Sequence, residues 1–167
     1  ADCLVPIVDP KPDKAIDLLN TELENLSDTF DEKWLSKMSA KLGITASALT
    51  KENDKKLVNQ WLELLENEGL DFTLSFRNLA ETLDLEKQKK DLLFKASDEF
   101  TAFEKAWKER LKKEKVDNAV IQERMNALNP RYIPRNHQVQ RAIEGAYEGD
   151  LTVFNEMNKV LKKPFTY

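Results

Sequence analysis

The chain has 167 residues, of which 41% are hydrophobic and 34% are charged, and its formal net charge is −4. This length is enough for one domain with a buried core, and the composition is too apolar for a disordered chain. The net negative charge argues against a nucleic-acid-binding protein, and no apolar run approaches the roughly 20 residues of a membrane-spanning helix. Cys3 is the only cysteine, which excludes a disulfide within the chain, and we expect a reducing, cytoplasmic compartment.

The first 44 residues predict two helices. Pro12 suits the first turn of a helix that runs to about Leu26. Its apolar residues recur at spacings of three and four and are expected to form one buried stripe: Ile16, Leu19, Leu23 and Leu26. Asp28 is expected to cap a second helix, which Gly43 ends in a left-handed conformation, with Ile44 packed back on the helix end. The inward residues of this second helix are expected to be Phe30, Trp34, Met38 and Leu42.

Two more helices are expected after a polar loop at residues 45–53. One begins at Asn53 or Asp54 and ends near Gly69, and the next is capped by Asp71. Their predicted buried residues are Leu57, Val58, Trp61, Leu62, Leu65, Phe72, Phe76, Leu79 and Leu83. The charged segment 86–91 is expected to be either a short helix or a solvated connection.

The second half predicts four further helices. Ser97 is expected to cap a long helix, whose inward residues are Phe100, Phe103, Trp107 and Leu111. The Lys-rich segment 108–115 at its end also contains glutamates, and it is interpreted as a solvated face. The next three helices begin at Asp117, Asn136 and Asp150, and they end at Pro130, Gly149 and Pro164. Their inward residues are expected to be Val120, Ile121, Met125, Leu128, Val139, Ala142, Ile143, Ala146, Leu151, Phe154, Met157 and Leu161.

No stretch alternates apolar and polar residues for long enough to predict a strand. The sequence therefore predicts an all-α fold, an irregular multi-helix bundle of about seven to nine helices. We expect residues 1–167 to form a single helical domain.

Few residues suggest chemistry. The single histidine excludes a di-metal site with two Glu-x-x-His pairs, and the four glycines do not form a phosphate-binding loop. We predict no catalytic residue, no bound cofactor and no metal ligand in this chain. The aromatic residues fall on apolar stripes and are interpreted as core.

Arginines and the only histidine gather between residues 131 and 141. Arg131, Arg135, His137 and Arg141 surround a predicted helix start at Asn136, where free backbone amides and guanidinium groups favour an anion. The alternative is that these arginines pair with carboxylates on neighbouring helices and hold a rigid, proline-containing loop in place. We favour the alternative and keep Arg131, Arg135 and His137 as weak candidates for an anion site.

Three segments resemble one known family. Residues 129–165, NPRYIPRNHQVQRAIEGAYEGDLTVFNEMNKVLKKPF, resemble the closing segment of the selenoprotein O (YdiU-type) family. Upstream, Trp34-Leu35 with KMSAKLG at 37–43 and DFTLSFRNL at 71–79 resemble two further elements of that family. The resemblance implies a pseudokinase-like enzyme that transfers AMP from ATP to protein hydroxyl groups with Mg or Mn. It also implies that the catalytic residues lie in a kinase-like part that precedes the matched region.

We therefore hypothesise that this chain is the C-terminal helical part of a longer kinase-like enzyme and is inactive alone. Its expected partners are the kinase-like core of the parent enzyme, which it scaffolds, and the protein substrates. The alternative is a free-standing helical module that recognises a protein partner without catalysis. A third hypothesis is a nucleotide- or phosphate-binding module built on Arg131, Arg135 and His137.

Overall fold

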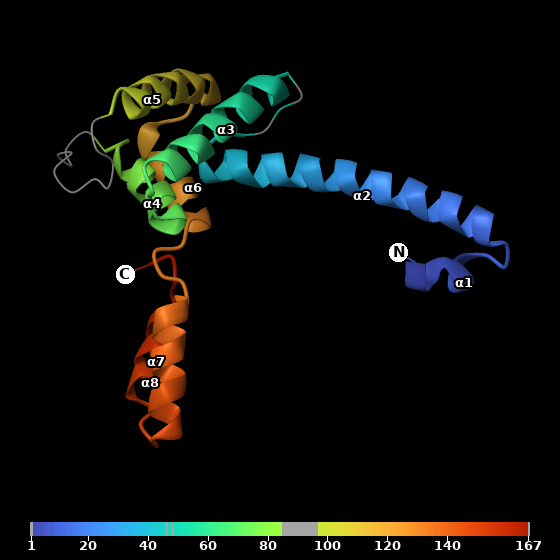
Figure 1. The fold of residues 1–167 in the computed structure, drawn as a ribbon. Helices are drawn as coiled ribbons and strands as arrows, with labels where there is room; N and C mark the ends of the chain where they lie inside the picture. The colour runs from blue at the N-terminus through green and yellow to red at the C-terminus, as the bar shows by residue number, and fades with distance from the viewer. Residues whose placement is uncertain (1, 46, 48, 85–96, 167) are drawn as a thin grey trace. The chain divides into compact units, whose positions relative to one another are not determined.

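The computed structural model describes residues 2–45, 47, 49–84 and 97–166. The described residues form eight α-helices and no strand (Figure 1), which confirms the all-α prediction and its helix count. The helices are α1 (Val5–Val8), α2 (Pro12–Lys41), α3 (Lys51–Asn67), α4 (Phe72–Glu81), α5 (Asp98–Leu111), α6 (Asn118–Leu128), α7 (Asn136–Tyr147) and α8 (Thr152–Leu161). Two short 3₁₀ helices, Asp2–Leu4 and Lys112–Glu114, flank α1 and α5. The charged segment 86–91 lies outside the described residues.

The chain divides into two compact units, Ala1–Met38 and Ser39–Tyr167. The expectation of a single domain in a longer enzyme stays a prediction. In the first unit, the predicted break at Asp28 is wrong, because α2 runs without interruption through that exposed residue. Neither proline nor glycine occurs between Pro12 and Gly43, and serine or aspartate inside a helix costs only a fraction of a kcal/mol, about 0.7 or less.

The apolar stripe on α2 is exposed, contrary to the prediction. Ile16 and Leu23 are 45% and 49% exposed, and Leu26 and Phe30 are each 63% exposed. Leu19 and Trp34 are half-buried. Nearer the C-terminal end of α2, Met38 and Leu42 are buried as predicted. The predicted burial is therefore wrong at Ile16, Leu23, Leu26 and Phe30, while Ala15 and Leu35, which the stripe did not include, are buried.

Glycine ends α2 and α3 as predicted. At the end of α2, Gly43 has φ +77°, its amide donates to the carbonyl of Ala40 (3.0 Å), and the amide of Ile44 donates to that of Ser39 (2.9 Å). These two bonds form a Schellman motif, and Ile44 packs back with 2% exposure. Gly69 (φ +62°) ends α3 in the same way, with the amide of Leu70 bonded to the carbonyl of Leu65 at 2.9 Å.

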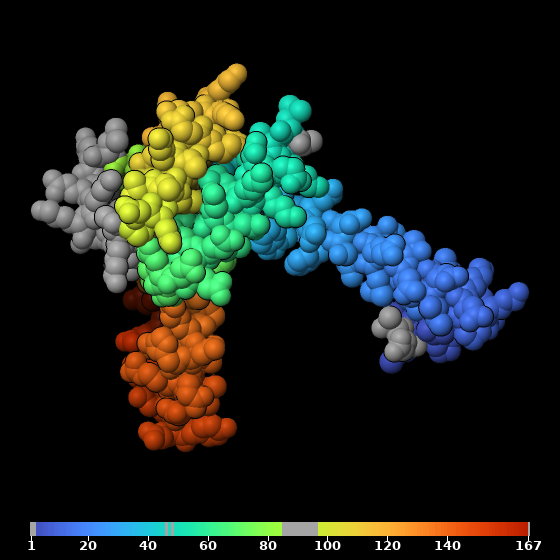
Figure 2. Space-filling view, turned by 45° about the horizontal axis from the view of Figure 1, so that its top comes forward, coloured from blue at the N-terminus to red at the C-terminus, as the bar shows by residue number. Residues whose placement is uncertain are grey.

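An aromatic cluster forms the core of the second unit. The ring of Trp61 on α3 lies 5.7 Å from that of Phe76 on α4 and 4.9 Å from that of Phe103 on α5. Trp107 stacks on Phe103 at 6.4 Å, and its indole nitrogen donates to the carbonyl of Leu42 (2.8 Å). Helices α3 and α5 lie against each other over this cluster (Figure 2). The prediction that the aromatic stripes of α3, α4 and α5 form the core is confirmed at these four residues.

Several predicted boundaries and burials differ from the structure. Helix α3 begins at Lys51 instead of at Asn53 or Asp54, and α7 begins at Asn136 itself, with Arg135 at the cap position. Leu151 precedes α8, although Asp150 still accepts a bond from the amide of Thr152 (2.8 Å). The residues predicted inward that are exposed are Phe72, Val120, Leu128, Ile143, Ala146, Leu151 and Phe154. These residues lie at helix ends or on α7 and α8, where the described residues provide little cover.

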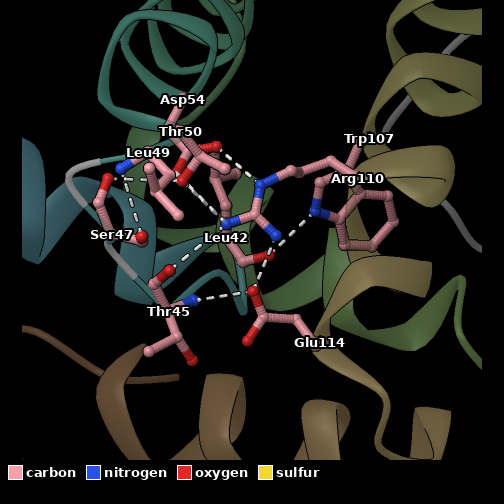
Figure 3. Close-up of polar contacts among 9 residues, drawn as sticks. All are labelled: Leu42, Thr45, Ser47, Leu49, Thr50, Asp54, Trp107, Arg110 and Glu114. Atoms are coloured by element: carbon pink, nitrogen blue, oxygen red, sulfur yellow. Dashed lines mark hydrogen bonds and ion pairs between the residues drawn. The ribbon is translucent and has the colours of Figure 1, made fainter.

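A buried charge network joins α3, α5 and the loop after α2 (Figure 3). Arg110 donates through Nε to Asp54 Oδ1 (2.7 Å) and through a terminal nitrogen to Glu114 Oε1 (2.7 Å). The side chain of Arg110 is 10% exposed, and those of Asp54 and Glu114 are 2% and 8% exposed. The hydrogen bonding that Arg110 donates to Asp54 is the main cause that raises the pKa of Arg110. The interpretation of residues 108–115 as a solvated face is therefore wrong for Arg110 and Glu114.

We predict that Gly43→Ala destabilises the fold more than Gly69→Ala. Both changes place a Cβ on a left-handed residue, which costs about 1–2 kcal/mol. Only at Gly43 would that Cβ meet neighbours, at 2.5 Å from Ile121 Cγ2 and 3.0 Å from Met125 Sδ, which adds about 1–3 kcal/mol of overpacking. Urea unfolding of both variants measures the difference. Equal losses would show that α6 yields to the new methyl group without cost.

We also predict that Arg110→Ala lowers the free energy of unfolding by about 3–5 kcal/mol, because it leaves the buried carboxylate of Asp54 without its guanidinium. Lys112→Ala is the matched control, since its ion pair with Glu109 is exposed (71% and 60%) and should matter little. Denaturant unfolding of both variants checks this. Similar losses for the two would contradict the assignment of a structural role to the buried pair.

Candidate functional site

The segment that joins α6 to α7 is fixed at its start by buried polar contacts. Asn129 is fully buried, its Nδ2 donates to the carbonyl of Lys41 (2.9 Å), and its Oδ1 accepts from Lys41 Nζ (3.0 Å). Arg77 on α4 donates to the carbonyls of Asn126 (2.8 Å) and Asn129 (3.1 Å). Burial lowers the pKa of Lys41, whose ammonium group lies 5.0 Å from the ring centre of Phe76. These contacts hold residues 126–129 against α4 and the end of α2.

The other end of this segment is held by an ion pair. Arg135 donates to Asp71 Oδ2 at 2.5 Å, while Asp71 Oδ1 caps α4 by accepting from the amide of Leu74 (2.7 Å). The bond from Arg135 is the main cause that lowers the pKa of Asp71, and it raises that of Arg135. The predicted cap at Asp71 is therefore confirmed, and the same carboxylate also anchors the start of α7.

The C-terminal part of the chain closes onto the same segment. The carbonyl of Pro164 accepts hydrogen bonds from the amides of Arg131 (2.7 Å) and Tyr132 (3.2 Å). In the chain between Tyr132 and Pro164, α7 and α8 run side by side (Figure 1). The helix pair is thus tied at its base both through Asp71 and through Pro164.

These elements surround a groove of about 540 Å³, which we call the hairpin groove. Its apolar lining consists of Leu74, Ile133, Val153, Met157, Val160 and Leu161. Its polar lining consists of Arg131, Tyr132, Arg135, His137, Gln138 and Glu156. The structure therefore brings the three predicted anion-site residues, Arg131, Arg135 and His137, to one cavity. Arg141 does not line the groove and donates to Gln138 Oε1 at 3.3 Å.

The groove carries charges of both signs. Arg135 forms an ion pair with Asp71, which agrees with the alternative in which the arginines pair with carboxylates of neighbouring elements. Glu156 adds a carboxylate to the lining of the groove. An apolar lining that includes a few polar groups is the usual form of a ligand or peptide site. The anion site itself stays a prediction, because this lining is mixed instead of strongly basic.

Sequence reasoning missed the residues that position the groove. Lys41 and Asn129 are 88 positions apart, and Leu74 and Glu156 come from helices that no local motif connects. In the part of the chain that the structure describes, no group of three or more His, Cys, Asp or Glu side chains is placed to hold a metal ion. No described helix has the length and apolar character needed to cross a membrane.

Comparison with known proteins identifies relatives over almost the whole chain. Residues 2–162 match the family model described as "Protein adenylyltransferase SelO". The chain is 33% identical over 167 residues to "Protein nucleotidyltransferase YdiU" of Clostridium perfringens, and 34% identical over 166 residues to the protein of that name in Agrobacterium fabrum. These alignments cover 100% and 99% of this chain but only 32% and 34% of the relatives. The chain therefore spans about a third of the length of the relatives that it matches.

We predict that Asp71→Asn makes stability less dependent on acid pH. The pKa of Asp71 is lower in the folded state than its ordinary value of 3.8. The ionised carboxylate therefore adds to the free energy of unfolding above pH 3.8, and this stabilisation is lost as the pH falls through the pKa of the folded state. Asparagine keeps the cap but removes the charge. Between pH 7 and pH 3, the melting temperature of the variant should therefore fall less than that of the wild type. Asp117→Asn is the control, because Asp117 occupies a cap position without a side-chain cap bond. An equal effect of both variants would contradict the role of the Arg135 pair.

Proposed function

The chain belongs to the SelO protein adenylyltransferase family, and on that premise we propose that it is the C-terminal helical region of such an enzyme. The whole enzyme transfers AMP from ATP to hydroxyl groups of proteins, with Mg or Mn, in a reducing, cytoplasmic compartment. Its catalytic residues lie in a pseudokinase-like core outside this chain. The present helices scaffold that core and shape the surface that receives the protein substrate. The names of the relatives support the reaction class, since they describe nucleotidyltransferases.

The exposed stripe of α2 carries the scaffold proposal. Ile16, Leu23, Leu26 and Phe30 stand at intervals of seven, three and four residues, which places them on one face. Burying a large apolar side chain contributes about 1.5–3 kcal/mol, so a row of them is a strong driving force for association. The relatives are about three times as long as this chain, which supports the proposal that the remaining two thirds of such an enzyme cover the stripe.

The role of this chain is therefore to be tested by complementation. The chain, purified as these 167 residues, is mixed with the separately expressed core of the same polypeptide, ATP, Mg or Mn and a protein substrate. We expect association and a change in AMP transfer, and no transfer by this chain alone. AMP transfer by the isolated chain would contradict the division of roles. Association with unrelated proteins but not with the core would favour the alternative, a free-standing interaction module.

A paired substitution on α2 sharpens this test. Leu26→Glu with Phe30→Glu places two charges on the stripe, and burying an unpaired charge is costly, so association with the core should weaken by at least about tenfold. Asn25→Glu, on the opposite face of the same helix and also exposed, is the control and should associate normally. Circular dichroism checks that α2 remains helical in both. If both variants bound the core with equal affinity, the stripe would not be part of the interface.

A further inference from the structure

Helices α7 and α8 bury little apolar surface by themselves. Of their residues, only Ala142 is buried, and α8 has no buried residue. Large apolar side chains are exposed along the pair at Ile143, Tyr147, Leu151, Phe154 and Val160. Helices of 12 and 10 residues depend on tertiary packing for their stability. Their apolar faces therefore have the character of an interface that the complete protein covers.

The hairpin groove is nevertheless fixed in shape. The ion pair of Arg135 with Asp71 holds one wall, and the bonds of Pro164 to the amides of Arg131 and Tyr132 hold the other end of the pair. A site that is held in position before binding loses less conformational freedom when its ligand arrives. The groove is thus suited to specific recognition.

The lining indicates the chemistry of the ligand. Val153, Met157, Val160 and Leu161 stand at intervals of four, three and one along α8 and form one apolar wall. Arg131 lies in the same lining as Glu156, so the groove carries charges of opposite sign beside the polar ring of His137. A phosphate group would meet the carboxylate of Glu156 and a guanidinium already paired with Asp71. A protein segment can instead offer an apolar side chain with a carboxylate on one side and a cation or amide donor on the other.

We infer that the hairpin groove binds a short amphipathic segment from the other two thirds of the same polypeptide, with an aliphatic or aromatic anchor beside an acidic residue. This inference rests on the proposed function, and it assigns a specific contact within it. The relatives extend over about three times the length of this chain, so the complementary segment has a source in the same molecule.

Overlapping peptides test the assignment. Fluorescent peptides of about 20 residues, long enough for several helical turns, cover the two thirds of the Clostridium perfringens relative that this chain does not match. Each is titrated into the 167-residue chain, and binding is followed by fluorescence anisotropy. One contiguous stretch of sequence, apolar with an acidic neighbour, should bind.

Two variants of α8 locate the binding. Val160→Glu introduces a charge into the apolar wall at a position that is 41% exposed, so the chain still folds, and it should weaken binding at least about tenfold. Asn155→Glu adds the same charge at an exposed position of α8 outside the groove and should leave affinity unchanged. Circular dichroism confirms the helix content of both.

Three results would overturn the assignment. The first is that no peptide binds, and the second is that Val160→Glu and Asn155→Glu bind equally well. The third is self-association of the wild-type chain in sedimentation experiments that Val160→Glu abolishes, which would assign the groove to a second copy. Peptide binding does not require AMP transfer. Specific binding together with failed complementation through α2 would therefore contradict the proposed function and keep the groove assignment.

Discussion

The exposed apolar stripe of α2 is the constraint on which the functional interpretation depends. Leu26 and Phe30 are each 63% exposed on a 30-residue helix that no proline or glycine interrupts. Exposing such a surface to water is unfavourable, because the removal of apolar area from water is the main favourable contribution to folding and association. The first unit therefore has a helix with an apolar face that the described residues leave exposed, and we propose that the core of the enzyme covers this face. That is the property expected of a region that joins a larger enzyme instead of acting alone.

The second unit contains the packed core of this region. Its aromatic core around Trp61 is framed by polar contacts that are themselves buried, among them Arg110 with Asp54 and Asn129 with Lys41. Buried ion pairs add little net stability, but breaking one leaves an uncompensated charge, so they fix one arrangement of the elements. Through Asn129 and Arg135 the same framework sets the base of α7 and α8. The hairpin groove is thus a consequence of the core and not an independent feature.

The sequence predicted the elements that depend on local signals. Asp71 and Ser97 cap their helices through bonds to amides three residues later, and Gly43 ends α2 with a left-handed residue, because these interactions need only neighbouring positions. The break at Asp28 was wrong because the same residue types that cap helices are also tolerated within them. Periodicity identified the stripe on α2, but it contains no information about what covers that face.

Contacts between residues that are far apart in the sequence could not be predicted from local patterns. Asp54 and Arg110 are 56 positions apart, and neither residue has a pattern around it that indicates the other. Arg131, Arg135 and His137 line one groove, and their closeness in sequence made that grouping accessible to local reasoning. Leu74 and Glu156, which turn that group into a groove, come from α4 and α8 and are joined to it only by the fold.

Hydrogen exchange at the α2 stripe tests the central claim most directly. The amides of residues 16–30 are measured once in this 167-residue chain and once in the longer enzyme of which we propose it is the C-terminal region. If the core covers the stripe, these amides should exchange at least about 100-fold more slowly in the full-length enzyme, because local opening then requires the interface to separate. Equal exchange rates in the two proteins would show that the stripe stays in solvent and would contradict the scaffold role.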